Sequence, residues 1–152
     1  MATVVSREGK LYSVDLLVAY VNVFKPGVIQ MPLSSLTESI NRPCWVDISS
    51  GNKFTIGDVL AHPERYPGHA EQVKNADLSY PTIWSRNYGM LDGKHRLAKA
   101  VRDNHESIKA CLVSNEVVEK CRIPGAPEDW DTIQLHLKPH QLITLFDKRF
   151  RQ

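Results

Sequence analysis

The stretch from Met90 to Ala100 constrains the fold most, because a strand must end and a helix must begin within two residues. Met90-Leu91 has the apolar character of a short strand, and Asp92-Gly93 separates it from a helical run that extends from Lys94 to about Asp103. Three apolar residues of this run share one helix face: Leu97, Ala100 and Val101. The chain is therefore expected to contain a strand–turn–helix unit within a domain of mixed α and β structure.

The turn at Asp92-Gly93 has the features of an anion-binding site. Gly93 permits backbone conformations that other residues resist, and it carries no Cβ that would block a ligand. The first N–H groups of a helix lack intrahelical partners and favour an anion, and Lys94, His95 and Arg96 add cationic or hydrogen-bonding side chains where the helix dipole disfavours positive charge. A bound phosphate would relieve that conflict. The alternative is a helix whose first turn is basic by chance, with Asp92 as its N-cap.

Basic residues are concentrated in the same part of the chain, although the net charge of the whole chain is only +2. Lys or Arg occurs at positions 86, 94, 96, 99, 102 and 109, and the acidic residues in that interval are Asp92, Asp103 and Glu106. This local excess favours an anionic ligand, whereas a solvated helix face is the alternative. The balance of 19 basic and 17 acidic residues does not by itself indicate a nucleic-acid-binding protein.

Length, apolar runs and cysteines place the chain in a broad class. Its 152 residues suit one domain. No apolar run reaches the roughly 18 residues of a membrane span, and the longest candidate, Val14 to Phe24, lacks the flanks of a secretion signal. Three cysteines without CxxC spacing predict reduced thiols. We therefore expect a soluble, cytoplasmic protein with no membrane partner.

Hydrophobic spacing and turn residues predict short helices and strands in alternation. Helices are expected over residues 14–24, 34–40, 55–60, 68–75, 94–103 and 115–120, and strands over 28–31, 44–48, 81–84, 90–91 and 107–113. Ser13 is expected to cap the first helix and Pro26-Gly27 to end it. The tail from Thr132 to Phe150 is expected to form a strand and then a helix.

The segment Tyr80-Pro81-Thr82-Ile83-Trp84, followed by a turn and then by Leu91 to Ala100, resembles the ParB N-terminal/sulfiredoxin superfamily. Members of that superfamily carry a Pro-Ile strand, a hairpin, and a Gly-x-His-Arg or Asp-Gly-His-x-Arg turn that opens a helix. The resemblance covers about residues 28–113. It implies a single α+β, ParB/sulfiredoxin-like domain over residues 1–152, in which a small mixed sheet with flanking helices forms a core of about residues 28–120.

The resemblance also implies that the turn holds the phosphates of ATP or another nucleotide, together with Mg²⁺. The nucleotide-binding residues would be Gly93, Lys94, His95 and Arg96. Sulfiredoxins need a cysteine where this chain has Lys94, and ParB proteins need a helix-turn-helix domain that is not recognisable here. Free serine kinases of this fold match best, because the chain keeps Asp92, Gly93, His95 and Arg96.

A kinase-like activity assigns the catalytic roles. Asp92 would hold Mg²⁺ and, with His95, take part in catalysis, while Glu64 would be the base that activates the attacking hydroxyl. Glu71 is the fallback for that base, and a surface carboxylate paired with Arg65 is the alternative explanation of Glu64. His62 or His69 would assist the base.

The expected function is phosphotransfer to a hydroxyl group of a small molecule, a nucleotide or a nucleic acid. The alternatives are a ParB-like DNA-binding or nuclease-type accessory protein and a non-catalytic nucleotide sensor. Strong salt-dependent binding to DNA would favour the accessory protein. The sequence specifies neither the substrate nor the oligomeric state.

Overall fold

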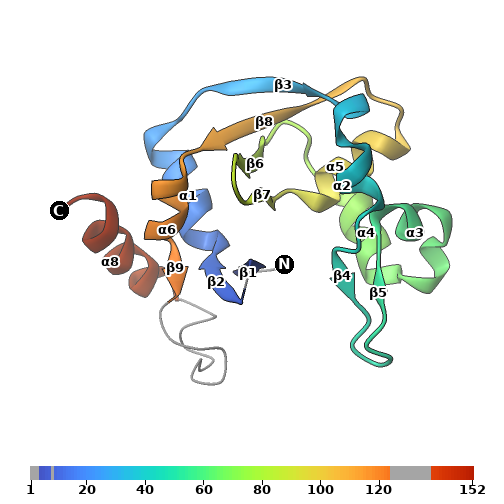
Figure 1. The fold of residues 1–152 in the computed structure, drawn as a ribbon, viewed down its shortest axis with the longest axis horizontal. Helices are drawn as coiled ribbons and strands as arrows, with labels where there is room; N and C mark the ends of the chain where they lie inside the picture. The colour runs from blue at the N-terminus through green and yellow to red at the C-terminus, as the bar shows by residue number, and fades with distance from the viewer. Residues whose placement is uncertain (1–3, 8, 124–137) are drawn as a thin grey trace. The chain divides into compact units, whose positions relative to one another are not determined.

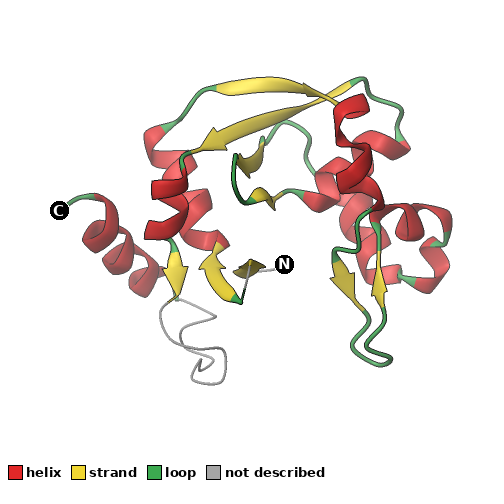
Figure 2. Ribbon diagram, viewed as in Figure 1, coloured by secondary structure: helices red, strands yellow, loops and turns green. Residues whose placement is uncertain are grey.

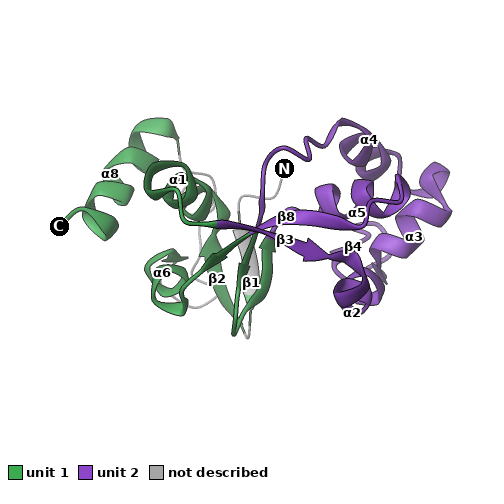
Figure 3. Cartoon of the chain, turned by 90° about the horizontal axis from the view of Figure 1, so that it is seen from above, with its two compact units in different colours: residues 1–27, 83–91, 111–152 green, residues 28–82, 92–110 purple. Residues whose placement is uncertain are grey.

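The computed structural model describes residues 4–7, 9–123 and 138–152, and it combines short helices with small β-sheets (Figure 1, Figure 2). The chain divides into two compact units, which Figure 3 distinguishes by colour. Unit 1 comprises residues 1–27, 83–91 and 111–152, and unit 2 comprises residues 28–82 and 92–110. The expected mixture of helices with small sheets is confirmed. The ParB/sulfiredoxin-like arrangement and the single domain stay predictions.

Unit 1 contains a small antiparallel sheet and, among the described residues, three helices. The strands are β1 (Val4–Arg7), β2 (Lys10–Ser13) and β9 (Arg122–Ile123), and the helices are α1 (Val14–Phe24), α6 (Asn115–Lys120) and α8 (Pro139–Phe150). Strand β2 pairs with both β1 and β9. Ser13 ends β2 and caps α1, because its hydroxyl accepts a hydrogen bond from the amide of Leu16 at 3.2 Å. Lys25 ends α1 in a left-handed conformation.

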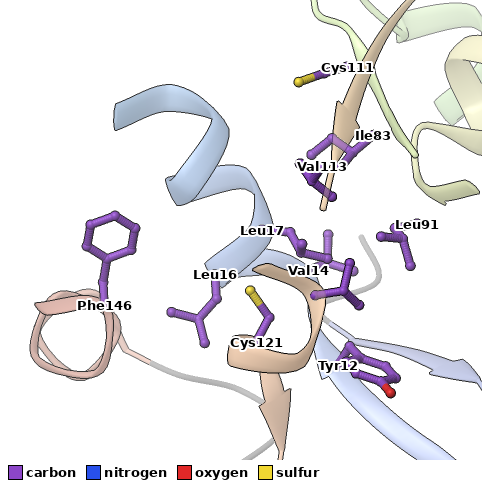
Figure 4. Packing of buried hydrophobic residues seen from close by; sticks show 11 residues of the cluster. Tyr12, Val14, Leu16, Leu17, Ile83, Leu91, Cys111, Val113, Cys121 and Phe146 are labelled. Atoms are coloured by element: carbon purple, nitrogen blue, oxygen red, sulfur yellow. The ribbon is translucent and has the colours of Figure 1, made fainter. Parts of the chain in front are cut away.

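The apolar core of unit 1 lies around the buried face of α1 (Figure 4). Leu16 and Leu17 are fully buried there, and Val118 of α6 and Phe146 of α8 belong to the same cluster. Cys111 and Cys121 are also buried in it and are free thiols, as expected. Burial raises the pKa of Cys121 to about 12, which keeps this thiol protonated and unreactive at neutral pH.

Unit 2 is built mainly from short helices and one hairpin. Its elements are η1 (Leu33–Leu36), α2 (Thr37–Asn41), β4 (Trp45–Val46), β5 (Lys53–Phe54), α3 (Ile56–Ala61), η2 (Pro63–Arg65), α4 (Pro67–Asn75) and α5 (Lys94–Arg102). A capping box at Thr55 and Asp58 begins α3. Helices α3 and α4 both pack against α5. Leu97, Ala98 and Ala100 form the buried face of α5, which confirms most of the expected apolar stripe.

A four-stranded sheet completes the fold. Its strands, in the order β3-β8-β6-β7, are β3 (Val28–Pro32), β8 (Ser107–Val113), β6 (Thr82–Ser85) and β7 (Gly89–Asp92). The chain passes from one unit to the other within β6, β7 and β8. In chain order, strand β7 is followed directly by the turn at Gly93 and then by α5.

Most of the expected elements are present, with differences at the ends. The helices expected over residues 14–24 and 115–120 and the strand over 107–113 have the predicted bounds. The strand expected over residues 44–48 covers only Trp45–Val46, because Asp47 begins a turn in which its carboxylate accepts hydrogen bonds from Ser49. The tail expectation for residues 132–137 lies outside the described residues. Strands β1, β2, β5 and β9 were not predicted.

Candidate functional site

Gly93 has the backbone conformation that the sequence requires, but the space beside it is already filled. Its φ is 110°, which L side chains rarely adopt, and α5 begins at the next residue. A Cβ built on Gly93 would lie 2.5 Å from Cγ2 of Thr82 and 3.1 Å from its Cα. The expectation that the missing Cβ leaves room for a ligand is therefore wrong. The missing side chain lets the first residue of β6 pack directly against the turn.

The first turn of α5 has no side-chain cap. Gly93 is the N-cap residue, and its carbonyl accepts the first helical hydrogen bond from Leu97 at 2.9 Å. Asp92 is not the N-cap, so the capping role that the alternative gave to Asp92 is wrong. Among the described residues, no side chain caps this helix, and its N-terminal amides carry the partial positive charge that attracts anions.

Asp92 and Arg96 form an ion pair across the first turn of α5. Nη2 of Arg96 lies 2.8 Å from Oδ2 of Asp92, and Nη1 donates to the backbone carbonyl of Pro81. Both side chains are about four-fifths buried, with exposed fractions of 21% for Arg96 and 20% for Asp92. Arg96 is thus held in one orientation, and Asp92 keeps only Oδ1 for any other ligand.

His95 lies in a stack of aromatic rings. Its ring is 5.0 Å from that of Trp45 and 5.2 Å from that of His69, and Nε2 of His95 shares a 2.9 Å hydrogen bond with Nδ1 of His69. Burial, followed by the positive charges of His69 and Lys94, lowers the pKa of His95 to about 4. His95 is therefore neutral at pH 7 and offers hydrogen bonds and a ring face, not positive charge.

The stack extends beyond the two histidines. The Trp45 ring lies 4.4 Å from that of His69, and Phe54 contacts Trp45, Tyr66 and His69. These rings come from β4, β5, α4 and α5, so the cluster ties the hairpin to two helices. Sequence reasoning missed it, because rings that are distant in the chain give no local pattern. His69 was named only as an assistant to a base, but it is the direct partner of His95.

The described contacts do not join Glu64 to the turn. Glu64 lies in η2 with 68% of its side chain exposed, and its carboxylate is 3.5 Å from Nδ1 of His62. The ion-pair partner of Glu64 is thus His62 and not Arg65, the partner expected in the alternative explanation. The fallback residue Glu71 accepts a hydrogen bond from the Asn75 side chain at 3.1 Å.

A metal site would have to be built on Asp92. Within residues 4–7, 9–123 and 138–152, no group of three or more His, Cys, Asp or Glu side chains is placed to hold a metal ion. Mg²⁺ nevertheless fits a site with one or two carboxylates when phosphate oxygens and water complete its six ligands. Oδ1 of Asp92 is compatible with such a role, because the only partner of this carboxylate in the described structure, Arg96, contacts the other oxygen.

Comparisons with protein-family models, curated proteins and solved structures gave no match. The likeness to the ParB/sulfiredoxin superfamily therefore rests on the sequence motif alone. Among the described residues, no helix combines the length and the apolar character needed to cross a bilayer.

Proposed function

We propose that this chain binds a nucleotide at the start of α5 and transfers a phosphoryl group to a hydroxyl group. The observation that carries the proposal is the uncapped first turn of α5, entered through a left-handed Gly93 and carrying Lys94 and Arg96. Backbone amides at such a turn bind phosphate oxygens, and Lys94 adds a point charge. This places the most highly charged part of the nucleotide next to a helix end that lacks its own cap.

The ion pair of Asp92 and Arg96 has a defined part in this proposal. Arg96 is already oriented by Asp92 and by the carbonyl of Pro81, so it loses little side-chain freedom when a phosphate arrives. Oδ1 of Asp92 would hold Mg²⁺ beside the phosphates. When bound, Mg²⁺ neutralises charge on the transferring phosphoryl group.

His95 orients the turn instead of neutralising phosphate. Its ring is fixed by the hydrogen bond to His69 and by stacking on Trp45. This fixes the backbone of the same helical turn whose amides face the proposed phosphates. We therefore expect His95→Ala to weaken nucleotide binding by disordering the turn, with a simultaneous loss of stability.

Glu64 remains the proposed base. Its carboxylate is exposed, and its single ion-pair partner in the described structure is His62, so it is accessible to a substrate hydroxyl. Glu64 lies shortly before α4, the helix whose His69 contacts His95. Phosphotransfer needs this base only in the chemical step, so Glu64→Gln should leave nucleotide affinity unchanged while transfer is lost.

The first experiment is a thermal-unfolding screen of the full chain with ATP, ADP, CTP and GTP, each with and without Mg²⁺. A bound nucleotide should raise the midpoint temperature by mass action. Calorimetric titration should then show affinity reduced by about 1–3 kcal/mol in Lys94→Ala or Arg96→Ala, the cost of losing a charged hydrogen bond. Lys53→Ala, an exposed lysine of β5, is the matched control.

Three results would each reject a part of the proposal. If none of the four nucleotides shifts the midpoint temperature, the chain does not bind a nucleotide. If the wild type and Lys94→Ala bind the nucleotide with equal affinity, the turn is not the binding site. Nucleotide binding without transfer to any hydroxyl acceptor would reject phosphotransfer and favour the sensor, whereas salt-dependent binding to DNA alone would favour the accessory protein.

A further inference from the structure

A pocket of about 220 Å³ opens in unit 2 beside Arg96. One wall is the segment from Leu78 to Thr82, which leads into β6, and another is the start of β8 with the loop before it. Ligand pockets for drug-sized molecules usually measure roughly 300–1,000 Å³. This pocket therefore suits a smaller ligand, or one that is only partly enclosed.

The walls of the pocket carry basic groups without an acidic one. Arg96, His105 and Lys109 all line it, and none of the described residues that line it is Asp or Glu. Three acids lie outside the lining. Asp92 pairs with Arg96, and Glu106 stands between His105 and Ser107 in the sequence. The hydrogen bonds from Ser79, and then the charges of Lys99 and Arg96, lower the pKa of Asp77. The lining itself thus favours an anion.

Arg96 keeps donors available for a ligand. A guanidinium has five N–H donors, and the hydrogen bonds to Asp92 and Pro81 use one on each terminal nitrogen. Those two contacts fix the plane of the group, so the remaining donors point in set directions. A fixed guanidinium plane is suited to the oxygens of a phosphate.

The end of α5 brings His105 to the pocket through a Schellman motif. Asn104 has a positive φ of 58°, the amide of His105 donates to the carbonyl of Ala100, and the amide of Asn104 donates to the carbonyl of Val101. This reversal turns the chain from α5 toward β8. His105 is exposed and lines the pocket immediately after the turn.

Lys109 supplies the charge on the β8 side. It is the exposed residue between buried Ile108 and Ala110, and its ammonium group makes one long contact of 3.5 Å with the carbonyl of Ser79. Hydroxyl and amide groups also line the pocket: Thr82 donates to the backbone carbonyl of Lys109, and Ser107 donates to Gln30. The pocket therefore combines a weakly engaged cation with polar groups that suit a hydroxylated ligand.

We propose that this pocket binds a small phosphomonoester, with the phosphate held by Arg96, Lys109 and His105. Tyr80, with 61% of its surface exposed, lies at the same pocket and offers a ring face to a sugar or a base. This site shares Arg96 with the amide end of α5 but differs from it in its other cations, because Lys94 does not line the pocket. It goes beyond nucleotide binding at the turn and needs no phosphoryl transfer.

The test is calorimetric titration of the full chain with ribose 5-phosphate, AMP and inorganic phosphate, alongside ribose and adenosine as uncharged counterparts. The phosphate esters should bind and the two uncharged compounds should not. Lys109→Ala and His105→Gln should each weaken ribose 5-phosphate binding by about 10-fold, the effect of losing one charged hydrogen bond. Lys53→Ala, which changes the same charge in β5, should leave that affinity unchanged.

Lys94→Ala separates the two sites. It should weaken ATP binding at the turn while leaving ribose 5-phosphate affinity intact, and Lys109→Ala should do the reverse. If Lys94→Ala and Lys109→Ala each lost the same affinity for ATP as for ribose 5-phosphate, the proposal of a separate pocket would be wrong. It would also be wrong if both Lys109→Ala and His105→Gln bound ribose 5-phosphate with wild-type affinity. If AMP binds more tightly than ribose 5-phosphate and Tyr80→Ala removes this difference, the natural ligand is a nucleotide. If the two compounds bind with equal affinity, the natural ligand is a phosphosugar.

Discussion

The apolar core of unit 1 and the ring stack of unit 2 differ in what they bury. Around Leu17 the core is mostly aliphatic, with Phe146 and two uncharged cysteine thiols among its members, and the hydroxyl of Tyr12 donates to the Glu119 carboxylate at 2.9 Å. The ring stack instead contains two half-buried imidazoles that hydrogen-bond to each other. The stability that the core of unit 1 contributes should therefore not change with pH near neutrality. The stability that the ring stack contributes to unit 2 should fall when a histidine of the stack takes up a proton.

The largest expected effect is on the apolar core. Leu17→Ala removes a side chain with 0% exposure, so the free energy of unfolding should fall by roughly 2–5 kcal/mol through lost burial and a residual cavity. Urea denaturation measures this change. Ile143→Ala on α8, where the side chain is 63% exposed, should stay within about 0.5 kcal/mol. Similar losses in the two variants would contradict the assigned core.

Gly93→Ala tests the turn that opens α5. The new side chain meets both an unfavourable φ of 110° and the Thr82 side chain, so unfolding free energy should fall by about 1–3 kcal/mol. Gly68→Ala in α4 has nothing within 4 Å and should be neutral or stabilising. Adding Thr82→Ser removes the 2.5 Å contact but keeps the strained φ, so it should restore only part of the loss. Complete rescue would show that the backbone conformation costs nothing.

Acidification should weaken the ring stack selectively. The folded-state pKa of His95, about 4, lies below its ordinary value of 6.5, so the unfolded chain binds the proton first as pH falls. Stability from this group is therefore complete above pH 6.5 and is lost between pH 6.5 and about 4. The loss should be on the order of 1–2 kcal/mol, allowing for solvent that still reaches the ring. The pKa of His69 is also lowered by burial and adds to the effect.

The check is urea denaturation at pH 7.5 and pH 5. His95→Asn should reduce the difference in stability between the two pH values. The deficit of Leu17→Ala relative to the wild type should be the same at both, because no titrating group is removed. An unchanged pH dependence in His95→Asn would show that the stack does not exclude a proton.

The smallest expected effect belongs to the polar edge of the unit 1 core. Tyr12→Phe removes the hydroxyl that donates to Glu119 and should cost about 0.5–1 kcal/mol of unfolding free energy. The loss stays small because Glu119 also accepts a hydrogen bond from Tyr88. Tyr20→Phe is the matched control, and its ring contacts with Phe24 and Phe150 remain. Equal effects of the two substitutions, measured by urea denaturation, would remove the stabilising role of the Tyr12 hydrogen bond.

Local signals made much of the secondary structure predictable. Ser13 and the apolar spacing after it specify α1, and the strand over residues 107–113 follows from its own alternation. Strand β2, by contrast, is four residues long and gains its place by pairing with β1 and β9. The partner β9 lies far along the chain, so no local pattern indicates it.

The candidate site was predictable only where its parts adjoin in sequence. The left-handed Gly93 and the following basic turn can be inferred from residues 92–96 alone. The ring stack joins Trp45, His69 and His95 from three separate elements, and the pocket joins Tyr80 to Lys109. Those groupings depend on tertiary packing, which cannot be predicted from the composition of the chain or from the spacing of residues along it.

The contact between Gly93 and Thr82 changes how evolutionary information about this turn should be interpreted. Selection for a foldable chain is sufficient to retain glycine at position 93, because any side chain would collide with Thr82. Invariance of this glycine among relatives would then report architecture, and activity should not be transferred between proteins on that basis. Position 94 carries the discriminating information, because libraries selected for ligand capture should retain lysine or arginine there.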